Sequence, residues 1–289
     1  MKKNNSQRNS RIGILIFIVA LIILGGLAYQ HFQHNSNGTA ISSVTPTGEE
    51  IQYGTLKDKV PSQTLAESVL VDSVKQELGN NIKWNGAGAF YINDNQSTLN
   101  ADVSSAPYAT NTPLNAHRQL GVANALLNKS TRQQQNRNAT SGENGKSNSA
   151  TIKPAGWIQK DFKGGAYSTL YNRGHLIGYA LVGGLRGFDA SEANPDNIAT
   201  QTAWANQASN GNSENTGQNY YETLVRKAID NGATVRYQVK PIYVGNELVP
   251  RGNQIQAKSK DGSLNFNVFI PNVQAGIGID YQTGKSQEK

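Results

Sequence analysis

The sequence has 289 residues, of which 37% are hydrophobic, and it contains no cysteine. This length suffices for one substantial core, while the lack of cysteine excludes disulfide-stapled small domains, thiolate catalysis and cysteine-ligated zinc sites. The formal net charge is +7, but after residue 29 the chain has 23 Lys and Arg against 20 Asp and Glu, which leaves +3. So mild an excess helps to attract a polyanion without identifying one.

Residues 12–29 form an uncharged apolar run, preceded in residues 1–11 by four basic residues and no acid. This pattern is typical of a membrane-directed segment whose N-terminus stays inside. We expect residues 1–11 to be a cytoplasmic tail and residues 12–29 an uncleaved, single-pass transmembrane anchor in the cell membrane, with the remaining chain outside. Small residues near Ala28 leave open a cleaved signal segment and a secreted protein.

Residues 30–60 are polar and show no sustained apolar period, which predicts a linker whose later part can lie on the surface of the next domain. That domain is expected to span residues 61–289. It begins with a predicted amphipathic helix that Ser62 caps and Gly79 stops, and whose apolar positions are Leu65, Val69, Val74 and Leu78. Residues 82–92 are rich in aromatic and β-branched side chains, which predicts strands of a hairpin.

The middle of the chain is less regular. The apolar spacing of residues 114–129 predicts a second helix, and residues 133–149 are polar enough to form an exposed loop that is able to touch a nucleic-acid backbone. Two strands are predicted, at residues 157–162 and 166–171, joined by a turn at Gly164-Gly165. Residues 176–185 fit a helix and an apolar loop equally well.

In the last third of the chain, some segments have the apolar spacing of a helix and others that of a strand. Residues 198–203 predict a strand and residues 218–230 an amphipathic helix. Strands follow at residues 234–244, 254–258 and 264–270, with a hairpin turn at Asp261-Gly262. Strands, then a helix, then strands indicate an α+β fold with an antiparallel sheet and not a parallel nucleotide-binding fold.

One of the four histidines stands in a setting suited to chemistry. His175 follows the strand predicted for residues 166–171, sits with Gly174 in a predicted turn, and precedes an apolar run. A histidine on such a turn is held out from the scaffold, and imidazole titrates near neutral pH, so it is able to accept a proton from water. On its own, a histidine in a turn is more often structural than catalytic.

An ordered set of residues surrounds this histidine. Asn172-Arg173-Gly174-His175 is followed by Asn197, Asn206 and Glu222, which lie 22, 31 and 47 residues after the histidine. With the flanking stretches NIATQTAWANQ and TGQNYYE, the set resembles the DNA/RNA non-specific endonucleases of the ββα-metal type, and most of all their streptococcal DNA-entry and streptodornase members. The resemblance covers residues 62–284, although many members carry Asp where this chain has Asn172.

The resemblance implies a fold and a reaction. The expected fold is α+β, with a central antiparallel sheet, flanking helices and a ββα-metal active-site motif. The expected reaction is hydrolysis of DNA and also RNA, with Mg²⁺ as the metal and Mn²⁺ as a possible substitute, leaving 5′-phosphate ends. Magnesium prefers oxygen ligands and keeps most of its waters, so a single amide oxygen suffices as protein ligand.

The resemblance also implies a role for each residue. His175 is the general base, Asn206 the magnesium ligand and Asn197 a second residue at the metal, while Glu222 orients groups around it. Arg173 supports the site or contacts phosphate. Each also has a structural alternative: Asn197 as a turn residue, Asn206 as a helix cap, Glu222 as a solvated acid and Arg173 as a packing residue.

Two other functions compete with the nuclease. A surface protein of the same fold could bind DNA for uptake without cutting it. A glycoside hydrolase would need a pair of carboxylates, and Asp189, Glu192 and Glu222 have no spacing that supports one.

Overall fold

The computed structural model describes residues 41–133 and 151–289. The predicted tail and anchor, residues 1–29, and nearly all of the predicted polar loop lie outside these ranges. Within them, no helix is long and apolar enough to cross a membrane.

A seven-stranded antiparallel sheet forms the centre of the fold, as predicted, with the strand order β1-β2-β9-β8-β7-β4-β3. Strand β7 alternates buried Val235, Tyr237 and Val239 with partly exposed Arg236 and Gln238, so one face is apolar. The strands are β1 (Ile82–Trp84), β2 (Phe90–Ile92), β3 (Tyr108–Asn111), β4 (Ala123–Leu127), β7 (Val235–Ile242), β8 (Gly252–Ser259) and β9 (Asn265–Pro271).

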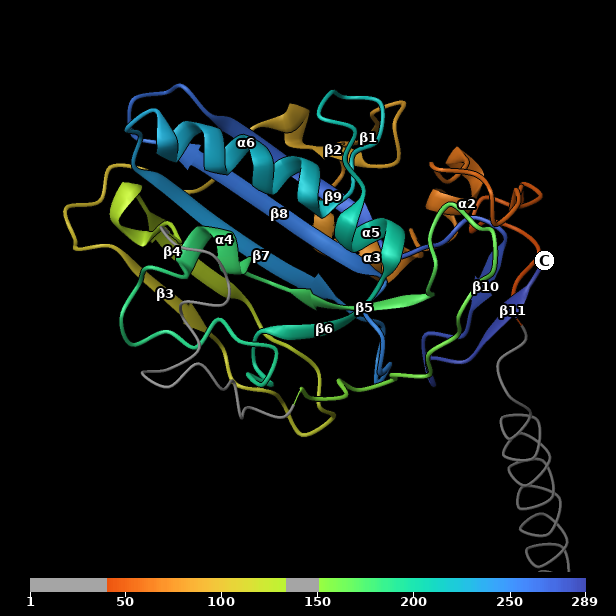
Figure 1. The fold of residues 1–289 in the computed structure, drawn as a ribbon. Helices are drawn as coiled ribbons and strands as arrows, with labels where there is room; N and C mark the ends of the chain where they lie inside the picture. The colour runs from red at the N-terminus through yellow and green to blue at the C-terminus, as the bar shows by residue number, and fades with distance from the viewer. Residues whose placement is uncertain (1–40, 134–150) are drawn as a thin grey trace, which may run out of the picture. The chain divides into compact units, whose positions relative to one another are not determined.

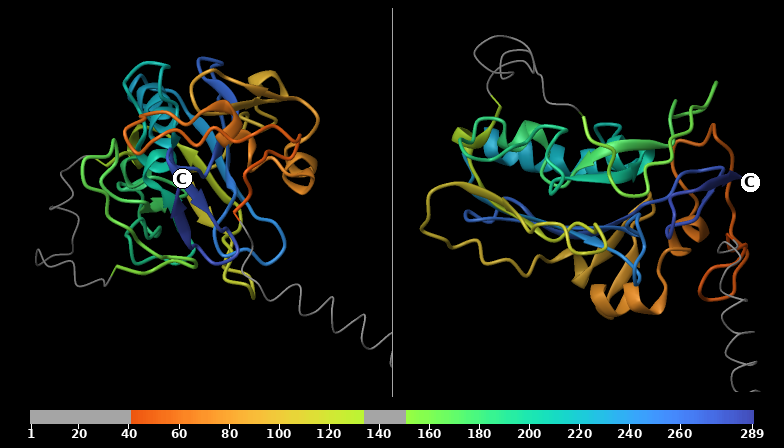
Figure 2. Two further views of the ribbon diagram at one scale, coloured as in Figure 1. Left: turned by 90° about the vertical axis from the view of Figure 1, so that its right-hand side faces the viewer. Right: turned by 90° about the horizontal axis from the view of Figure 1, so that it is seen from below.

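Helix α6 (Gln218–Asp230) lies across that apolar face, within the bounds predicted from its spacing (Figure 1). Its buried residues Tyr221, Val225 and Ile229 recur every four residues and point at the sheet. The short helices α2 (Gln63–Glu67) and α3 (Asp72–Leu78) lie on the opposite face, where Glu77 of α3 pairs with Lys240 of β7 at 2.8 Å (Figure 2).

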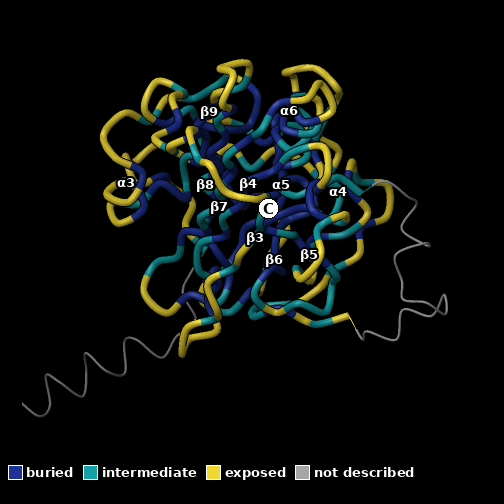
Figure 3. Tube along the Cα trace, turned by 90° about the vertical axis from the view of Figure 1, so that its left-hand side faces the viewer, coloured by how far each residue is buried: buried dark blue, intermediate teal, exposed yellow. Residues whose placement is uncertain are grey.

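A smaller unit packs beside α6 on the same side of the sheet. The strands β5 (Tyr171–His175) and β6 (Ile198–Thr202) pair antiparallel, and helix α5 (Ala203–Gln207) follows directly, giving the order ββα. The short helix α4 (Tyr179–Val182) follows β5, while the 3-10 turns η1 (Asn93–Asn95) and η2 (Lys129–Thr131) follow β2 and β4 of the main sheet. Figure 3 shows that the buried residues gather where these layers meet.

The main sheet holds this unit through a buried asparagine. Asn272, at the end of β9, accepts a hydrogen bond from Thr202 N (2.7 Å) and donates to Thr200 O (3.1 Å), so its amide pairs with the open edge of β6 as a neighbouring strand would. Thr202 also caps α5, because its hydroxyl oxygen accepts from Ala205 N at 3.1 Å. The position of α5 therefore follows from contacts with the main sheet.

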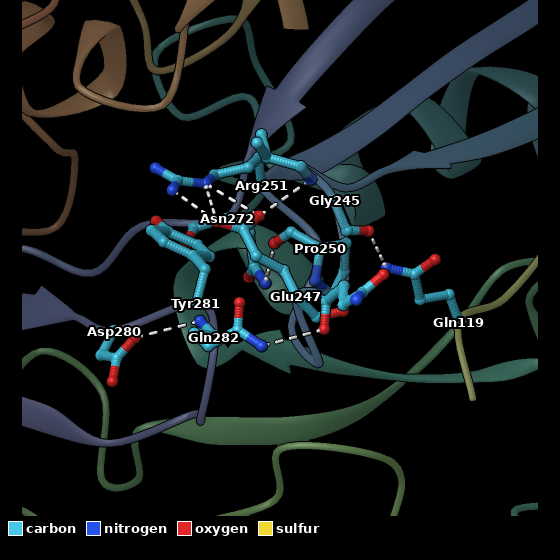
Figure 4. Close-up of polar contacts among 11 residues, drawn as sticks. Gln119, Gly245, Glu247, Pro250, Arg251, Asn272, Asp280, Tyr281 and Gln282 are labelled. Carbon is cyan, nitrogen blue, oxygen red and sulfur yellow. Dashed lines mark hydrogen bonds and ion pairs between the residues drawn. The ribbon is translucent and has the colours of Figure 1, made fainter. Parts of the chain in front are cut away.

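A buried ion pair supports the same end of the sheet. Arg251 forms a bidentate pair with Glu247, with Nε 2.9 Å from Oε1, and its guanidinium lies 4.3 Å from the centre of the Tyr281 ring (Figure 4). The Tyr281 hydroxyl donates to Asn272 O at 2.8 Å. The small strands β10 (Ile277–Ile279) and β11 (Ser286–Glu288) close this region.

The described part of the predicted linker, residues 41–60, runs along the folded domain. Ile51 is buried in the core, and Gln52 N donates to the hydroxyl of Thr64 in α2 at 2.9 Å. Residues 41–289 form one compact unit.

The single helix predicted after Ser62 is two helices. Ser62 caps α2 as predicted, with its hydroxyl oxygen accepting from Leu65 N at 3.1 Å, and all four predicted apolar residues are buried. The helix ends early because the Ser68 hydroxyl bonds to Leu65 O and Val71 takes an extended backbone conformation before α3.

The helix predicted for residues 114–129 is wrong, since this segment is a loop followed by β4. Asn115 makes a turn in which its side-chain oxygen accepts from His117 N and Gln119 N. Ala123, Ala125 and Leu127 then alternate as buried positions on a strand paired with β3 and β7. The apolar residues of this segment are compatible with both the helical and the strand period, and pairing with the neighbouring strands stabilises the strand.

The strand predictions before His175 also need correction. Residues 157–170 reverse near Gly164 as predicted, but their two arms share only an isolated antiparallel bridge, Asp161 with Thr169, beside the hydrogen bond from Phe162 N to Ser168 O (2.7 Å), and form no regular strands. The strand itself begins at Tyr171 and includes His175, so Gly174 is a strand residue opposite Ala199 and not part of a turn.

The other predicted elements are present, whereas β3, β10 and β11 lie in segments for which the sequence analysis predicts no strand. The hairpin of residues 82–92 and the strands β6 to β9 are present, and Gly262, with φ +75°, lies in the loop that joins β8 to β9. The ambiguous segment after His175 contains the short helix α4.

Candidate active site

The ββα unit displays the predicted residues on three consecutive elements. His175 is the last residue of β5 and lies opposite Ile198, the first residue of β6, while Asn206 lies on α5. Glycine is favoured before the histidine, because a Cβ at Gly174 would stand 2.0 Å from Oε1 and 2.7 Å from Cβ of Gln201. The side chain of Gln201 therefore gives a physical reason for the Arg-Gly-His order.

The ring of His175 is oriented by a backbone carbonyl. Its Nε2 lies 3.0 Å from Ala190 O. A carbonyl only accepts, so this bond requires the proton on Nε2 and assigns the basic lone pair of the neutral ring to Nδ1. Histidine is thereby prepared to act as a base through one defined nitrogen.

Asn197 fixes the chain that follows the histidine. Its side-chain oxygen accepts from Ile177 N (3.0 Å) and from Asn111 Nδ2 (3.1 Å), and its nitrogen donates to Ile177 O (3.2 Å). The side chain is 0% exposed. With its oxygen already accepting two protein hydrogen bonds, Asn197 is arranged to hold the loop of residues 176–178 and not to offer a ligand to solvent.

We expect Asn197→Ala to lower both thermal stability and kcat while leaving the magnesium dependence in place. The substitution leaves Ile177 N and O buried without partners, which costs about 1–3 kcal/mol. Melting temperature, kcat and the magnesium concentration for half-maximal cleavage are the measurements. Asn267→Ala, an equally buried amide of β9 that contacts Gln96 and Gln254, should lower stability without lowering kcat. A large rise in half-saturating magnesium for Asn197→Ala would instead make it a metal ligand.

Asn206 differs from Asn197 in having an available amide. It is half-buried on α5, and within residues 41–133 and 151–289 its side chain makes no hydrogen bond. The neighbouring Gln207 ties this end of α5 to β5, because its side-chain oxygen accepts from Asn172 Nδ2 at 3.0 Å. Asn206 thus presents an amide on a helix that contacts β5, which is not the arrangement of a helix cap, since Thr202 performs that role.

Glu222 is nearly buried on the second turn of α6, with 12% of its side chain exposed. Oε1 accepts from Gln218 Nε2 at 3.0 Å, and Oε2 lies 3.8 Å from the Arg226 guanidinium. It packs against Gly178, where a Cβ would stand 2.5 Å from Oε2. Burial raises the pKa of Glu222, and the hydrogen bond from Gln218 and the charge of Arg226 offset only part of that rise.

Arg173 is engaged by two packing contacts. Its Nε donates to Ile152 O at 2.6 Å, and its guanidinium carbon lies 4.8 Å from the centre of the Trp157 ring. These contacts favour the structural alternative for Arg173 over a direct contact with phosphate. Asn172 accepts from the Thr169 hydroxyl at 3.3 Å and donates to Gln207 of α5, so it bridges β5 to α5.

The structure adds residues that the sequence did not single out. Ala190 contributes only a carbonyl, so its identity carries no signal. Gln201, Gln218 and Arg226 are polar residues with buried or half-buried contacts to the site. Gln201 lies within the stretch NIATQTAWANQ and Gln218 within TGQNYYE, whereas Arg226 lies outside both.

The oxygen atoms that Asn206 and Glu222 offer are suited to weak binding of a hard cation such as Mg²⁺. In the described ranges, no three His, Cys, Asp or Glu residues form a group that could hold a metal by themselves. An amide oxygen with the nearly buried carboxylate of Glu222 on the adjacent helix matches the oxygen preference of Mg²⁺ and its tendency to rely on substrate phosphate and water.

Comparisons with known proteins agree with this geometry. Residues 86–286 match the model of the DNA/RNA non-specific endonuclease family. The magnesium-bound crystal structure of NucA from Streptococcus agalactiae is 40% identical, with a TM-score of 0.67 over 75% of this chain and 94% of that one. Metal-free NucA is 42% identical, with a TM-score of 0.64 over 72% and 90%. The zinc-bound Sda1 nuclease, 19% identical, shares the fold, with a TM-score of 0.52 over 71% and 98%.

Proposed function

This chain belongs to the DNA/RNA non-specific endonuclease family, and we propose that it hydrolyses the phosphodiester bonds of DNA, and also of RNA, in a magnesium-dependent reaction. The observation that supports the proposal most strongly is that one ββα unit contains both an oriented histidine, His175 on β5, and an available amide, Asn206 on α5. The similarity to NucA, which has been solved with magnesium, supports the choice of metal.

His175 is the general base in this proposal. With Nε2–H donating to Ala190 O, Nδ1 accepts a proton from a water molecule as its oxygen attacks the phosphorus atom. The bond from phosphorus to the 3′ oxygen breaks, leaving a 5′-phosphate and a 3′-hydroxyl once that oxygen is protonated. Backbone contacts carry no sequence information, so no base preference is expected.

Asn206 would hold the magnesium ion through its amide oxygen, with Glu222 close to its surroundings. When bound, the ion would neutralise charge that develops on the phosphate and its departing oxygen. Manganese, with the same preference for oxygen, should substitute. Asn197 keeps the backbone after His175 in place, and Glu222, fixed between Gln218 and Arg226, places its carboxyl group against the loop at Gly178.

Incubating the purified protein with plasmid DNA and with single-stranded RNA tests the reaction directly. We expect cleavage with magnesium, partial or full activity with manganese, and none with EDTA. Binding of DNA without any cleavage under all metal conditions would support the alternative, a surface DNA-binding protein for uptake, and would refute the enzyme.

Glu222 gives the proposal a pH-dependent prediction for stability. The fold raises the pKa of Glu222, so the folded protein favours the protonated carboxyl, and this group's contribution to stability is present at low pH and is lost as the pH rises through the raised pKa. Glu222→Gln carries a permanently neutral side chain. Its melting temperature should therefore match that of wild type near pH 4 and exceed it increasingly toward pH 8.

Thermal melts of both proteins from pH 4 to 8 measure this difference. Glu214→Gln, which changes an exposed acid on the loop before α6, should show no such trend. A difference that is constant with pH, or that shrinks as the pH rises, would contradict the raised pKa.

For location, we propose that residues 12–29 anchor the enzyme in the cell membrane with the nuclease domain outside, on the strength of the apolar run and its basic flank. Fractionation of cells that express the full chain, followed by sizing of the released protein, distinguishes an anchored enzyme from one secreted after cleavage near Ala28.

A further inference from the structure

Gln218 stands at the meeting point of four elements. It is the first residue of α6 and is 1% exposed. Its Nε2 donates to His175 O at 2.6 Å and to Glu222 Oε1 at 3.0 Å, and its Oε1 accepts from Gln201 Nε2 at 3.1 Å and from Asn253 Nδ2 at 3.0 Å. One amide thereby joins β5, β6, β8 and α6.

The chemistry of the partners fixes the orientation of this amide. A backbone carbonyl accepts and does not donate, so Nε2 has to face His175, and both of its hydrogens are then used. Both lone pairs of Oε1 are used by the amides of β6 and β8. A glutamine is the side chain that meets all four demands at once, because glutamate lacks the two hydrogens and methionine lacks every polar atom.

The location of Gln218 depends on close helix packing. Gly217, the residue before it, has no room for a side chain, because a Cβ there would stand 2.7 Å from Trp204 O and from the Cβ of Ala208. The start of α6 therefore lies directly against α5, the helix that carries Asn206. This contact lets the amide of Gln218 reach the carbonyl of His175 from the helix side.

We propose that Gln218 is a positioning residue that holds the backbone of His175 and the carboxylate of Glu222 in a fixed relation through its two donated hydrogen bonds. The inference rests on the proposed nuclease function. Asn197 fixes the residues after His175 and Ala190 orients its ring, while Gln218 fixes the carbonyl of the histidine itself. His175 on β5 and Glu222 on α6 are thus held by the same side chain.

Two substitutions separate this role from simple packing. Gln218→Met keeps the side-chain volume and removes all four bonds. Gln218→Glu keeps oxygen acceptors for Gln201 and Asn253 but has no hydrogens for His175 O and Glu222. If only the attachment of α6 to β6 and β8 mattered, Gln218→Glu would keep its activity; if positioning matters, both variants lose it.

Gln119 offers a matched control outside the ββα unit. It is also a buried glutamine, 8% exposed, whose Nε2 donates to Gly245 O at 2.8 Å and Glu247 O at 3.0 Å and whose Oε1 accepts from Asn115 (Figure 4). Gln119→Met and Gln119→Glu remove equivalent bonds. They should reduce the melting temperature while leaving kcat at the wild-type value.

The measurements are kcat and KM on DNA with saturating magnesium, melting temperature, and hydrogen exchange of the peptide that contains residues 176–178, all on the full chain. We expect both Gln218 variants to lose about 10- to 100-fold in kcat, as displacements near 1 Å do, with little change in KM. Exchange in that peptide should be faster in the Gln218 variants and unchanged in the Gln119 variants.

Wild-type kcat in Gln218→Glu would overturn the proposal. So would losses of kcat in the Gln119 variants that match those of the Gln218 variants at equal loss of stability. A wild-type protein that cleaves nothing would refute the proposed nuclease, while the exchange measurement would still decide whether Gln218 holds the loop after His175.

Discussion

Replacement of His175 by alanine is expected to lower kcat by about 10²- to 10⁴-fold, the usual cost of removing a general base. The fold should persist, because β5 pairs with β6 through backbone groups that alanine retains. Losing the hydrogen bond to Ala190 O removes only about 1 kcal/mol. DNA affinity should also persist, since the base acts in the transition state.

His117→Ala is the matched control, because His117 is exposed in the loop before β4 and its backbone, not its ring, makes the turn with Asn115. It should cleave DNA at the wild-type rate. His175→Gly leaves a space that free imidazole can enter, so added imidazole should restore part of the activity. Cleavage by His175→Ala at the wild-type rate would show that another group is the base.

The sequence predicts those parts of the fold whose apolar residues follow one period only. Tyr221, Val225 and Ile229 fit a helix and no strand, and the alternation around Tyr237 fits a strand and no helix, so α6 and β7 are found correctly. Ala123 and Leu127 fit both periods, and only pairing with β3 and β7 decides for a strand. Such pairing joins segments that are distant in the sequence, so the local sequence does not reveal it.

Some features of the candidate site can likewise be predicted from the sequence, and others cannot. His175, Asn206 and Glu222 can be proposed from the sequence because the role proposed for each depends on its side chain, and because their spacing resembles that of a family. The carbonyl of Ala190 cannot be predicted, because every residue has one. The difference between Asn197 and Asn206, one with its amide oxygen fully engaged and one without a partner in the described residues, likewise appears only in three dimensions.

Asn206→Ala is expected to abolish cleavage at ordinary magnesium concentrations, because it removes the one amide oxygen proposed to hold the ion. A neutral ligand holds a divalent cation weakly, so wild type should need bound phosphate to retain magnesium. Asn206→Asp should then bind the ion more tightly in the free enzyme. The added negative charge would also reduce the net positive charge that faces the phosphate, so kcat should fall even as binding improves.

Two titrations separate these effects. Isothermal calorimetry of the free proteins with magnesium measures binding without catalysis, and we expect the order Asn206→Asp, wild type, Asn206→Ala from tightest to weakest. Cleavage as a function of magnesium gives kcat and the half-saturating concentration for each. Asn210→Ala, at an exposed asparagine just beyond α5, should match wild type in both.

If Asn206→Ala cut DNA with unchanged magnesium dependence, the ligand would lie elsewhere. Glu222 would be the first group to test, since the amide oxygen of Asn197 is already engaged by Ile177 and Asn111.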